Sequence, residues 1–403
     1  MLPRFLASVR SRRRWALLLV VGVAAALAGR FFWAEFQLRA ARRALERRAY
    51  PEAQAHLQRY LQVWPRSATA HLLGARCSRG AGNFDEAFSL LSDCRQLHAD
   101  REALILEEYL LDAQRGTLGP VEEEALRHRL ERGGPETPDI LEAMALGCLY
   151  TNRLGEAMAC VERWLAYAPG DSQALYLRGL AREGMGAVHE AGEDYRQAVR
   201  RDPEHVPARK RRAEYLIYTG AYPEAAALFQ QLLEREPQDV NLVLGLARCR
   251  RAQGKTAEAE RLLDQLLGHG SAPAAVLVER SCLARETGDF GAAEKWYRQA
   301  LAQDPSDYDA CYGLGQCLRA LGRPKEAQDF EAQAAHIDRD LKRLRQLHEQ
   351  MARNPDNVEL PYEAGMICLR NGQKNEARRW FRNVLQGNPY HEGARKGLEQ
   401  SVQ

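Results

Sequence analysis

Apolar and small side chains recur along the chain at helical spacing, and the same arrangement returns every 34 residues. In residues 288–305, Ala293, Tyr297, Ala300 and Leu301 fall on one helical face, with charged residues between them. The alanine of this stretch has counterparts at steps of 34 residues, which are Ala157, Ala191, Ala225, Ala259, Ala293 and Ala327, and Ala53 and Ala87 are separated by the same step. So long a period predicts an array of similar units.

Each unit is predicted to be a pair of helices joined by a turn. A glycine five residues before the alanine ends the first helix, and a proline twelve residues after it stops the second, because the proline ring cannot continue a helix. The glycines are Gly82, Gly186, Gly220, Gly254, Gly288, Gly322 and Gly372, and the prolines are Pro65, Pro169, Pro203, Pro237, Pro305 and Pro389. One helix pair cannot bury its apolar face alone, so neighbouring units must stack.

Ten such units are expected, and two of them depart from the pattern. The units start near residues 34, 68, 102, 138, 172, 206, 240, 274, 308 and 358. In the unit near residue 102, Val121 replaces the alanine, and Gly133-Gly134-Pro135 adds two residues. Between Ala327 and Ala377 lie 50 residues, which is one period plus 16.

The second departure predicts one long helix over residues 324–353, about 45 Å at 1.5 Å per residue. Its apolar positions alternate at steps of four and three residues: Phe330, Ala334, Ile337, Leu341, Leu344, His348 and Met351. This row, called the α-seam below, is expected to pack on the adjacent unit. A coiled coil with a second copy or with a partner is the alternative.

With these residues in view, the repeat resembles the tetratricopeptide repeat. Residues 288–305 follow G-D-F-x-x-A-x-x-x-Y-x-x-A-L-x-x-x-P, and Leu314-Gly315 matches the family's Leu-Gly pair. The resemblance covers about nine tenths of the chain. It implies an all-α fold, a right-handed α-solenoid of about ten helix-turn-helix repeats over residues 34–390, and residues 391–403 are expected to form a polar capping helix. The lysine and asparagine clamp with which one co-chaperone subfamily binds C-terminal carboxylates has no match here.

The N-terminus has a different character. An uncharged apolar run, residues 15–29, follows the Arg12-Arg13-Arg14 cluster, and extension to residue 34 gives the roughly 20 residues that span a bilayer. We therefore expect residues 1–33 to contain a basic cytoplasmic segment and a transmembrane anchor. A cleaved signal peptide is an alternative, because Ala26-Leu27-Ala28 fits an A-x-A cleavage site. A buried core helix is the remaining alternative.

The orientation of this anchor is less clearly encoded. Five arginines precede the apolar run, and six arginines follow it within about twenty residues, so the positive-inside rule is nearly balanced. Because the later arginines fall on a predicted folded helix, we expect the N-terminus in the cytoplasm and the solenoid outside it. The expected location is a bacterial cytoplasmic membrane, or an exported soluble state if a signal peptide is cleaved.

Composition and motifs argue against catalysis and against nucleic acid. The net charge is +3, and the five arginines that precede the first acidic residue account for more than all of it. No basic domain for nucleic acid is therefore indicated. The nine cysteines are scattered without a C-x-x-C pair, and no metal, phosphate-loop or nucleophile motif is present. No catalytic residue, cofactor or metal is expected.

The expected binding surface is the groove lined by the first helices of the units. One helical position carries apolar or aromatic residues in most units, and a position two turns later carries arginine in four of them. The candidate groove residues are Arg79, Tyr176, Arg251, Val278, Arg285, Tyr312, Arg319 and Tyr362. Aromatic residues beside arginines are typical of protein-binding surfaces. The structural alternative is that these arginines complement helix dipoles and that the apolar residues pack.

The sequence therefore predicts a membrane-anchored, non-catalytic scaffold that binds segments of partner proteins, similar to N-terminally anchored bacterial tetratricopeptide proteins of the envelope. Residues 15–34 would contact the lipid bilayer. Two alternatives stay open at this stage: a structural envelope protein that self-assembles through residues 324–353, and a regulatory subunit of a separately encoded enzyme.

Overall fold

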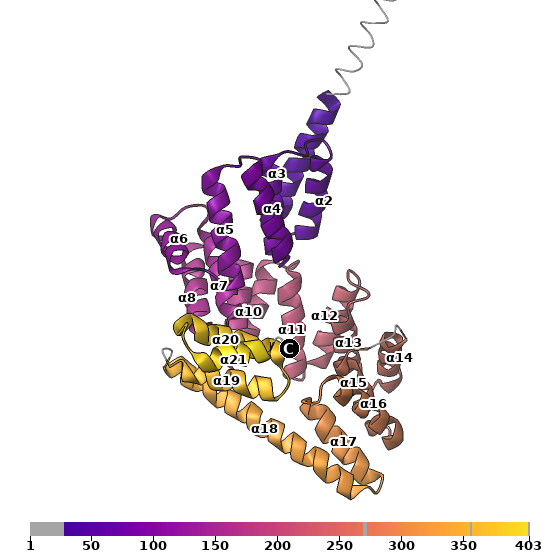
Figure 1. Cartoon of the computed structure of the whole chain (residues 1–403). Helices are drawn as coiled ribbons and strands as arrows, with labels where there is room; N and C mark the ends of the chain where they lie inside the picture. The colour runs from indigo at the N-terminus through magenta and orange to yellow at the C-terminus, as the bar shows by residue number, and fades with distance from the viewer. Residues whose placement is uncertain (1–27, 269–271, 355–356, 402–403) are drawn as a thin grey trace, which may run out of the picture. The chain divides into compact units, whose positions relative to one another are not determined.

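The structure is a computed structural model that describes residues 28–268, 272–354 and 357–401, and its regular elements in these ranges are all α-helices. The chain divides into two compact units at the bond between Gly134 and Pro135. Each unit is an array of antiparallel helix pairs, as the repeat pattern predicts (Figure 1).

The first unit contains three helix pairs. Its first helix is described from residue 28 to residue 46, so the expected boundary between residues 33 and 34 falls inside one helix. The helices that follow are α2 (Tyr50–Leu61), α3 (Ala68–Gly80), α4 (Phe84–Gln96), α5 (Arg101–Arg115) and α6 (Pro120–Arg132).

The second unit contains the remaining helix pairs and one short terminal helix. Its first eight helices are α7 (Thr137–Tyr150), α8 (Leu154–Tyr167), α9 (Ser172–Gly184), α10 (Val188–Arg201), α11 (Val206–Tyr218), α12 (Tyr222–Leu233), α13 (Val240–Ala252) and α14 (Thr256–Leu267). They are followed by α15 (Ala274–Glu286), α16 (Phe290–Gln303), α17 (Tyr308–Ala320), α18 (Pro324–Arg353), α19 (Glu359–Arg370), α20 (Lys374–Gly387) and α21 (Glu392–Gln400). The last of these lies where the capping helix is expected.

The repeated alanine and glycine have the structural roles that their spacing predicts. Ala157, Ala225, Ala259, Ala293 and Ala327 have no exposed surface, because a second helix packs directly over each. Each repeated glycine has a positive φ, for example +83° at Gly288, which L-residues with a Cβ adopt at a cost. The chain therefore leaves the first helix and re-enters the second in a short turn.

The irregular unit near residue 102 lies at the boundary between the two compact units. Val121, which replaces the repeated alanine, is 75% exposed, and α6 buries only Leu126 and Leu130. Gly133 ends α6 with a φ of +69°. A weakly packed second helix followed by Gly-Gly-Pro explains why the array divides here, although the sequence pattern indicates one solenoid over residues 34–390.

The long helix is present with the predicted bounds, and its α-seam is mostly covered within the second unit. Ala334 and Ile337 are buried beside Cys311 of α17, whereas Leu344 and Met351 pack on the core of the last repeat. Burial lowers the pKa of His348, whose ring lies 5.4 Å from that of Trp380. Leu341, at 40% exposure, is the α-seam residue on the surface. This agrees with the packing interpretation, and self-association through this helix stays a prediction.

The predicted membrane anchor falls mostly outside the described residues. Of residues 15–34, only those from 28 onward are described, as the start of the first helix. Within the described ranges no helix is both long enough and apolar enough to cross a bilayer, so the expected transmembrane helix is not among these elements.

Candidate partner-binding surface

The first helices of neighbouring repeats are joined by buried glutamates that each bind two arginines. In the first unit, Glu107 of α5 accepts hydrogen bonds from Arg76 at 3.1 Å and Arg79 at 2.6 Å, both on α3. Glu107 is 1% exposed and Arg79 is 8% exposed. Because both charges are buried, their pairing is required for the two helices to pack.

The second unit repeats this arrangement in the same register. Glu279 of α15 accepts from Arg248 at 3.3 Å and from Arg251 at 2.5 Å, both on α13. The sequence separations, 31 and 28 residues, equal those in the first unit. The arginine row of the candidate groove therefore forms contacts between repeats, a role that the pattern within one repeat did not reveal. Its signal was present as an arginine followed by a glutamate 28 residues later.

The other candidate arginines also have partners within the chain. Arg285 donates through Nη1 to Gln316 at 2.5 Å, and Arg319 pairs with Glu331 of α18 through Nη2 at 2.6 Å. The Arg319 side chain is 54% exposed, against 26% for Arg251. Of these arginines, Arg319 is therefore the most available to a partner protein.

The aromatic and apolar row differs in exposure from unit to unit. Val278 is 7% exposed and belongs to the core of its repeat, so it offers no surface to a partner. Tyr176 and Tyr362 are half-buried, and each ring contacts a histidine that begins a later helix, His205 at 5.3 Å and His391 at 4.6 Å. Tyr312 is 47% exposed, and its role as a binding residue is the most consistent with its position.

A short exposed stripe on α17 combines both residue types. Tyr308 and Tyr312 lie one turn apart with their rings 5.9 Å apart and nearly parallel, at 6°. Arg319 follows two turns after Tyr312 on the same helical face. Tyr308, Tyr312 and Arg319, called the α17 stripe below, offer an aromatic surface beside a cation. Such a pair suits a segment that contains apolar side chains and a carboxylate.

A polar cluster connects α9 and α11. The hydroxyl of Tyr195 donates to Glu183 at 2.5 Å, and Arg211 lies 3.5 Å from the same carboxylate. Burial and the hydrogen bond to Glu183 raise the pKa of Tyr195, so its hydroxyl stays protonated. This cluster also contacts Tyr176, whose pKa is raised by burial. The arrangement fixes the helices but contains no group poised to transfer a proton near neutral pH.

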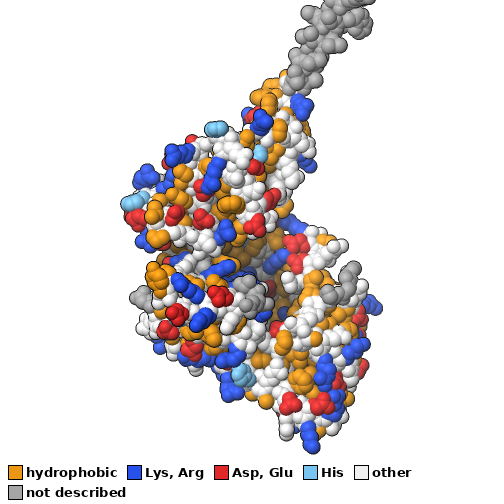
Figure 2. Space-filling view, in the orientation of Figure 1, with side chains coloured by type: hydrophobic (Ala, Val, Ile, Leu, Met, Phe, Trp, Pro, Cys, Tyr) orange, Lys and Arg blue, Asp and Glu red, His pale blue; other side chains and the backbone are white. Residues whose placement is uncertain are grey.

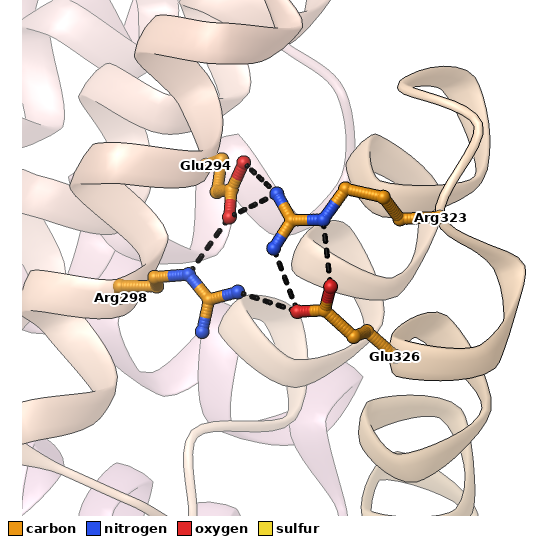
Figure 3. Close-up of polar contacts among 4 residues, drawn as sticks. All are labelled: Glu294, Arg298, Arg323 and Glu326. Atoms are coloured by element: carbon orange, nitrogen blue, oxygen red, sulfur yellow. Dashed lines mark hydrogen bonds and ion pairs between the residues drawn. The ribbon is translucent and has the colours of Figure 1, made fainter.

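The second helices carry their own inter-repeat contact, shown in Figure 3. Glu294 and Arg298 of α16 form a closed ring of ion pairs with Arg323 and Glu326 at the start of α18, with separations from 2.6 to 3.3 Å. Burial alone would raise the pKa of Glu294, but hydrogen bonds from Arg298 and Arg323 lower it. Sequence patterns indicate a solvated face here, whereas the structure uses it to join two repeats.

Thiols and acidic clusters provide little reactive chemistry. Burial raises the pKa of Cys77, Cys94, Cys249, Cys311 and Cys317 to about 11, which keeps these thiols protonated and poorly nucleophilic. Across the described ranges no group of three or more His, Cys, Asp or Glu residues is arranged to hold a metal ion. On the face shown in Figure 2, basic and acidic side chains are interspersed.

Comparisons with known proteins concern the repeat. One family model, described as tetratricopeptide repeat, matches residues 216–276 and 284–351, and a second with the same description matches residues 38–96 and 143–206. Together they match more than half of the chain.

Curated relatives match only parts of this chain. A TPR repeat-containing protein of Pseudomonas aeruginosa is 26% identical over 191 residues, which is 47% of this chain and 30% of that protein. Tetratricopeptide repeat protein 7B of Homo sapiens is 31% identical over 120 residues, which is 30% of this chain and 14% of that protein. The chain thus spans less than a third of the length of each of these two relatives.

Solved structures are similar at low identity. A tetratricopeptide repeat protein from Parabacteroides merdae matches 71% of this chain and 99% of its own, with 17% identity and a TM-score of 0.37. PilW, described as a widely conserved type IV pilus biogenesis factor, matches 50% of this chain and 93% of its own, with 20% identity and a TM-score of 0.44.

Proposed function

The chain belongs to the tetratricopeptide repeat family, and we propose that it is a membrane-anchored, non-catalytic scaffold whose repeats bind segments of partner proteins. Proteins of this family generally mediate protein–protein interactions. The observation that supports this role most directly is the α17 stripe, where an exposed stacked tyrosine pair lies beside a half-exposed arginine. Exposed aromatic and arginine residues are those that contribute most to protein interfaces.

The proposed partner segment carries an apolar or aromatic side chain and a carboxylate about two helical turns away. The ring of Tyr312 would cover the apolar side chain, and Arg319 would exchange its contact with Glu331 for the carboxylate of the partner. This exchange costs little, because surface ion pairs contribute only about 0–1 kcal/mol.

Capture experiments test this surface. Full-length protein is cross-linked in cells and its partners are identified, and the Tyr312→Ala variant is expected to lower their yield about tenfold or more, as for an interface residue that contributes about 1.4 kcal/mol or more. Tyr167→Ala is the matched control, because Tyr167 is 53% exposed on a second helix. Equal loss in both variants, or no loss with Tyr312→Ala, would rule out the α17 stripe.

The N-terminal segment is proposed to attach the scaffold to a bilayer, with the N-terminus in the cytoplasm and the repeats outside a bacterial cytoplasmic membrane. Besides the apolar run of residues 15–29, the first described helix begins with exposed aromatic residues: Phe31 is 49%, Phe32 71%, Trp33 42% and Phe36 62% exposed. Aromatic side chains that water contacts at the end of an apolar run suit a membrane–water interface.

Alkaline extraction of membranes tests the anchor. The full-length protein is expected to stay with the membrane pellet, whereas Val20→Arg combined with Val21→Arg should move most of it to the supernatant, because each arginine costs about 2.5–3.5 kcal/mol at the centre of a span. Val121→Arg, at an exposed position of α6, is the control. Complete extraction of the unchanged protein contradicts the anchor, and N-terminal sequencing that begins at residue 29 would indicate the cleaved form.

A further inference from the structure

The last repeat of the second unit contacts the first repeat of the same unit. Arg379 and Arg382 of α20 approach the ring of Tyr150, at 5.4 and 5.6 Å from its centroid, and Arg382 also donates to the Tyr150 hydroxyl at 2.6 Å. Asn152 donates to Glu376 of α20 at 2.8 Å. These residues are more than 220 positions apart in sequence, and Figure 1 shows α20 beside α8.

The extra length of α18 accounts for the position of the last repeat. The regular second helices α8, α10, α12, α14 and α16 have 12 to 14 residues, whereas α18 has 30. The last repeat packs on the C-terminal half of α18, through Leu344, Leu347 and Met351. A shift of 16 residues moves this repeat by about 24 Å along the helix. The insertion therefore takes α20 out of the regular array and toward the turn that follows α7.

The turn after α7 departs from the repeat pattern where it meets α20. In every other described turn between paired helices of this unit, the left-handed position holds a glycine, at residues 186, 220, 254, 288, 322 and 372. Here the position holds Asn152, with a φ of +57°, and its side-chain amide makes the bond to Glu376. An asparagine at this position is less favourable for the turn than glycine, and its gain is the contact with α20.

The contact consists of exposed polar and aromatic groups and has no apolar core. Tyr150 is 37% exposed, and the side chains of Arg379 and Glu376 are 43% and 38% exposed. Exposed cation–π contacts and single charged hydrogen bonds are individually weak. Because the packed helix pairs on both sides are held by buried residues, this contact is the part of the closed arrangement that opens most readily.

We propose that Tyr150, Asn152, Glu376, Arg379 and Arg382 form a clasp that reversibly closes the second unit on itself. When closed, the clasp fixes the curvature of the repeats between α8 and α19, and so the width of the surface that their first helices offer. When open, the last repeat is attached only through α18. This device is independent of whether the α17 stripe binds a partner.

Carbodiimide cross-linking of the full-length protein tests the closed state. The Asn152→Lys variant places an ammonium group beside Glu376, and Arg48, with a φ of 54°, shows that a long cationic residue fits the same position of another repeat. We expect an amide cross-link between position 152 and Glu376 within one chain, identified by mass spectrometry. Tyr150→Leu or Arg382→Ala in this background should lower its yield about tenfold, in line with the loss of two weak contacts.

Arg378→Ala is the matched control, because Arg378 lies on the same helix but bonds only to Lys374 and Asn375 of that helix. It should leave the yield unchanged. In mixtures of chains with different isotopes, a cross-link found only between chains would show that α20 meets a second copy and would overturn the proposal. An absent cross-link, or one that Tyr150→Leu and Arg382→Ala do not reduce, would also overturn it.

Hydrogen exchange of Asn152→Gly provides a second test that does not depend on a cross-link. Glycine suits the left-handed backbone, so this variant should leave the α7–α8 turn at least as stable. Amides of α19–α21 should nevertheless exchange several-fold faster, because the bond to Glu376 is lost. Unchanged exchange in α19–α21 would show that Asn152 serves only its own turn.

Discussion

Gly313→Ala is expected to destabilise the second unit by about 2–3 kcal/mol, although it adds only one methyl group. A Cβ at residue 313 would lie 2.4 Å from both Cζ and the hydroxyl oxygen of Tyr297. Tyr297 belongs to the preceding repeat, has no exposed surface and lies within the core cluster around Ala293 and Leu314. Its hydroxyl lies 3.4 Å from the Cys282 sulfur. The ring therefore has no space into which it could move.

The measurement is local stability from hydrogen exchange in α15–α18, because repeat arrays seldom unfold in one step. Gly291→Ala is the matched control. Gly291 lies in α16, and the nearest atom that a Cβ at this residue would meet, Asp289 Oδ1, is 3.8 Å away. Alanine there should be neutral or stabilising by up to about 0.5–1 kcal/mol, because glycine disfavours helices.

A double substitution distinguishes the clash from a general effect on α17. Tyr297→Leu removes the far end of the ring and should itself cost about 2–4 kcal/mol. In that background the added cost of Gly313→Ala should fall below about 1 kcal/mol, since the clashing atoms are gone. If the two costs simply add, the close approach of this ring is not the cause.

Much of the fold follows from local sequence. Alanine, glycine and proline positions depend on one helix pair, and they predict the pairs, their turns and the bounds of α18. Gly313 was not recognised in this way, because its neighbour Tyr297 is on another helix and the glycine has ordinary helical backbone. The glycine in this case is needed for the space it leaves, which spacing along one chain segment does not reveal.

The candidate surface was predicted less completely, for a related reason. The sequence places Tyr312 and Arg251 at equivalent rows of first helices, yet one is exposed and the other is bound to two carboxylates. The difference arises from the residue that the next repeat offers 28 to 35 positions later. A row derived from one repeat cannot include that partner. The clasp depends on pairs more than 220 residues apart and has even less local signal.

Glu279→Ala should cost about 2–3 kcal/mol of local stability in α13–α15. Glu279 is 4% exposed and accepts from both Arg248 and Arg251, so its removal leaves two cations beside an apolar helix interface. The two arginine side chains are 44% and 26% exposed and gain some hydration in the variant. The cost is therefore below the roughly 3–5 kcal/mol of a fully sealed pair.

Glu286→Ala is the control, because Glu286 pairs with the same Arg251 but its side chain is 45% exposed. It should cost about 0–1 kcal/mol, and that cost should fade in 1 M salt, where the Debye length is about 3 Å. The effect of Glu279→Ala should persist in the same salt, since burial prevents screening. Equal costs for the two variants, measured by hydrogen exchange, would contradict the role of Glu279 as the buried link.

The same pair sets the condition for testing Arg251 as a partner contact. Arg251→Glu would place a third carboxylate beside Glu279 and Glu286, so a loss of partner binding could arise from separation of α13 and α15. Arg251→Met combined with Glu279→Met removes both charges and keeps apolar volume, which is often close to neutral for stability. If that double variant keeps the exchange protection of α13–α15 and still binds partners, Arg251 serves only to join the repeats. If protection is kept but binding is lost, the arginine row also contacts the partner.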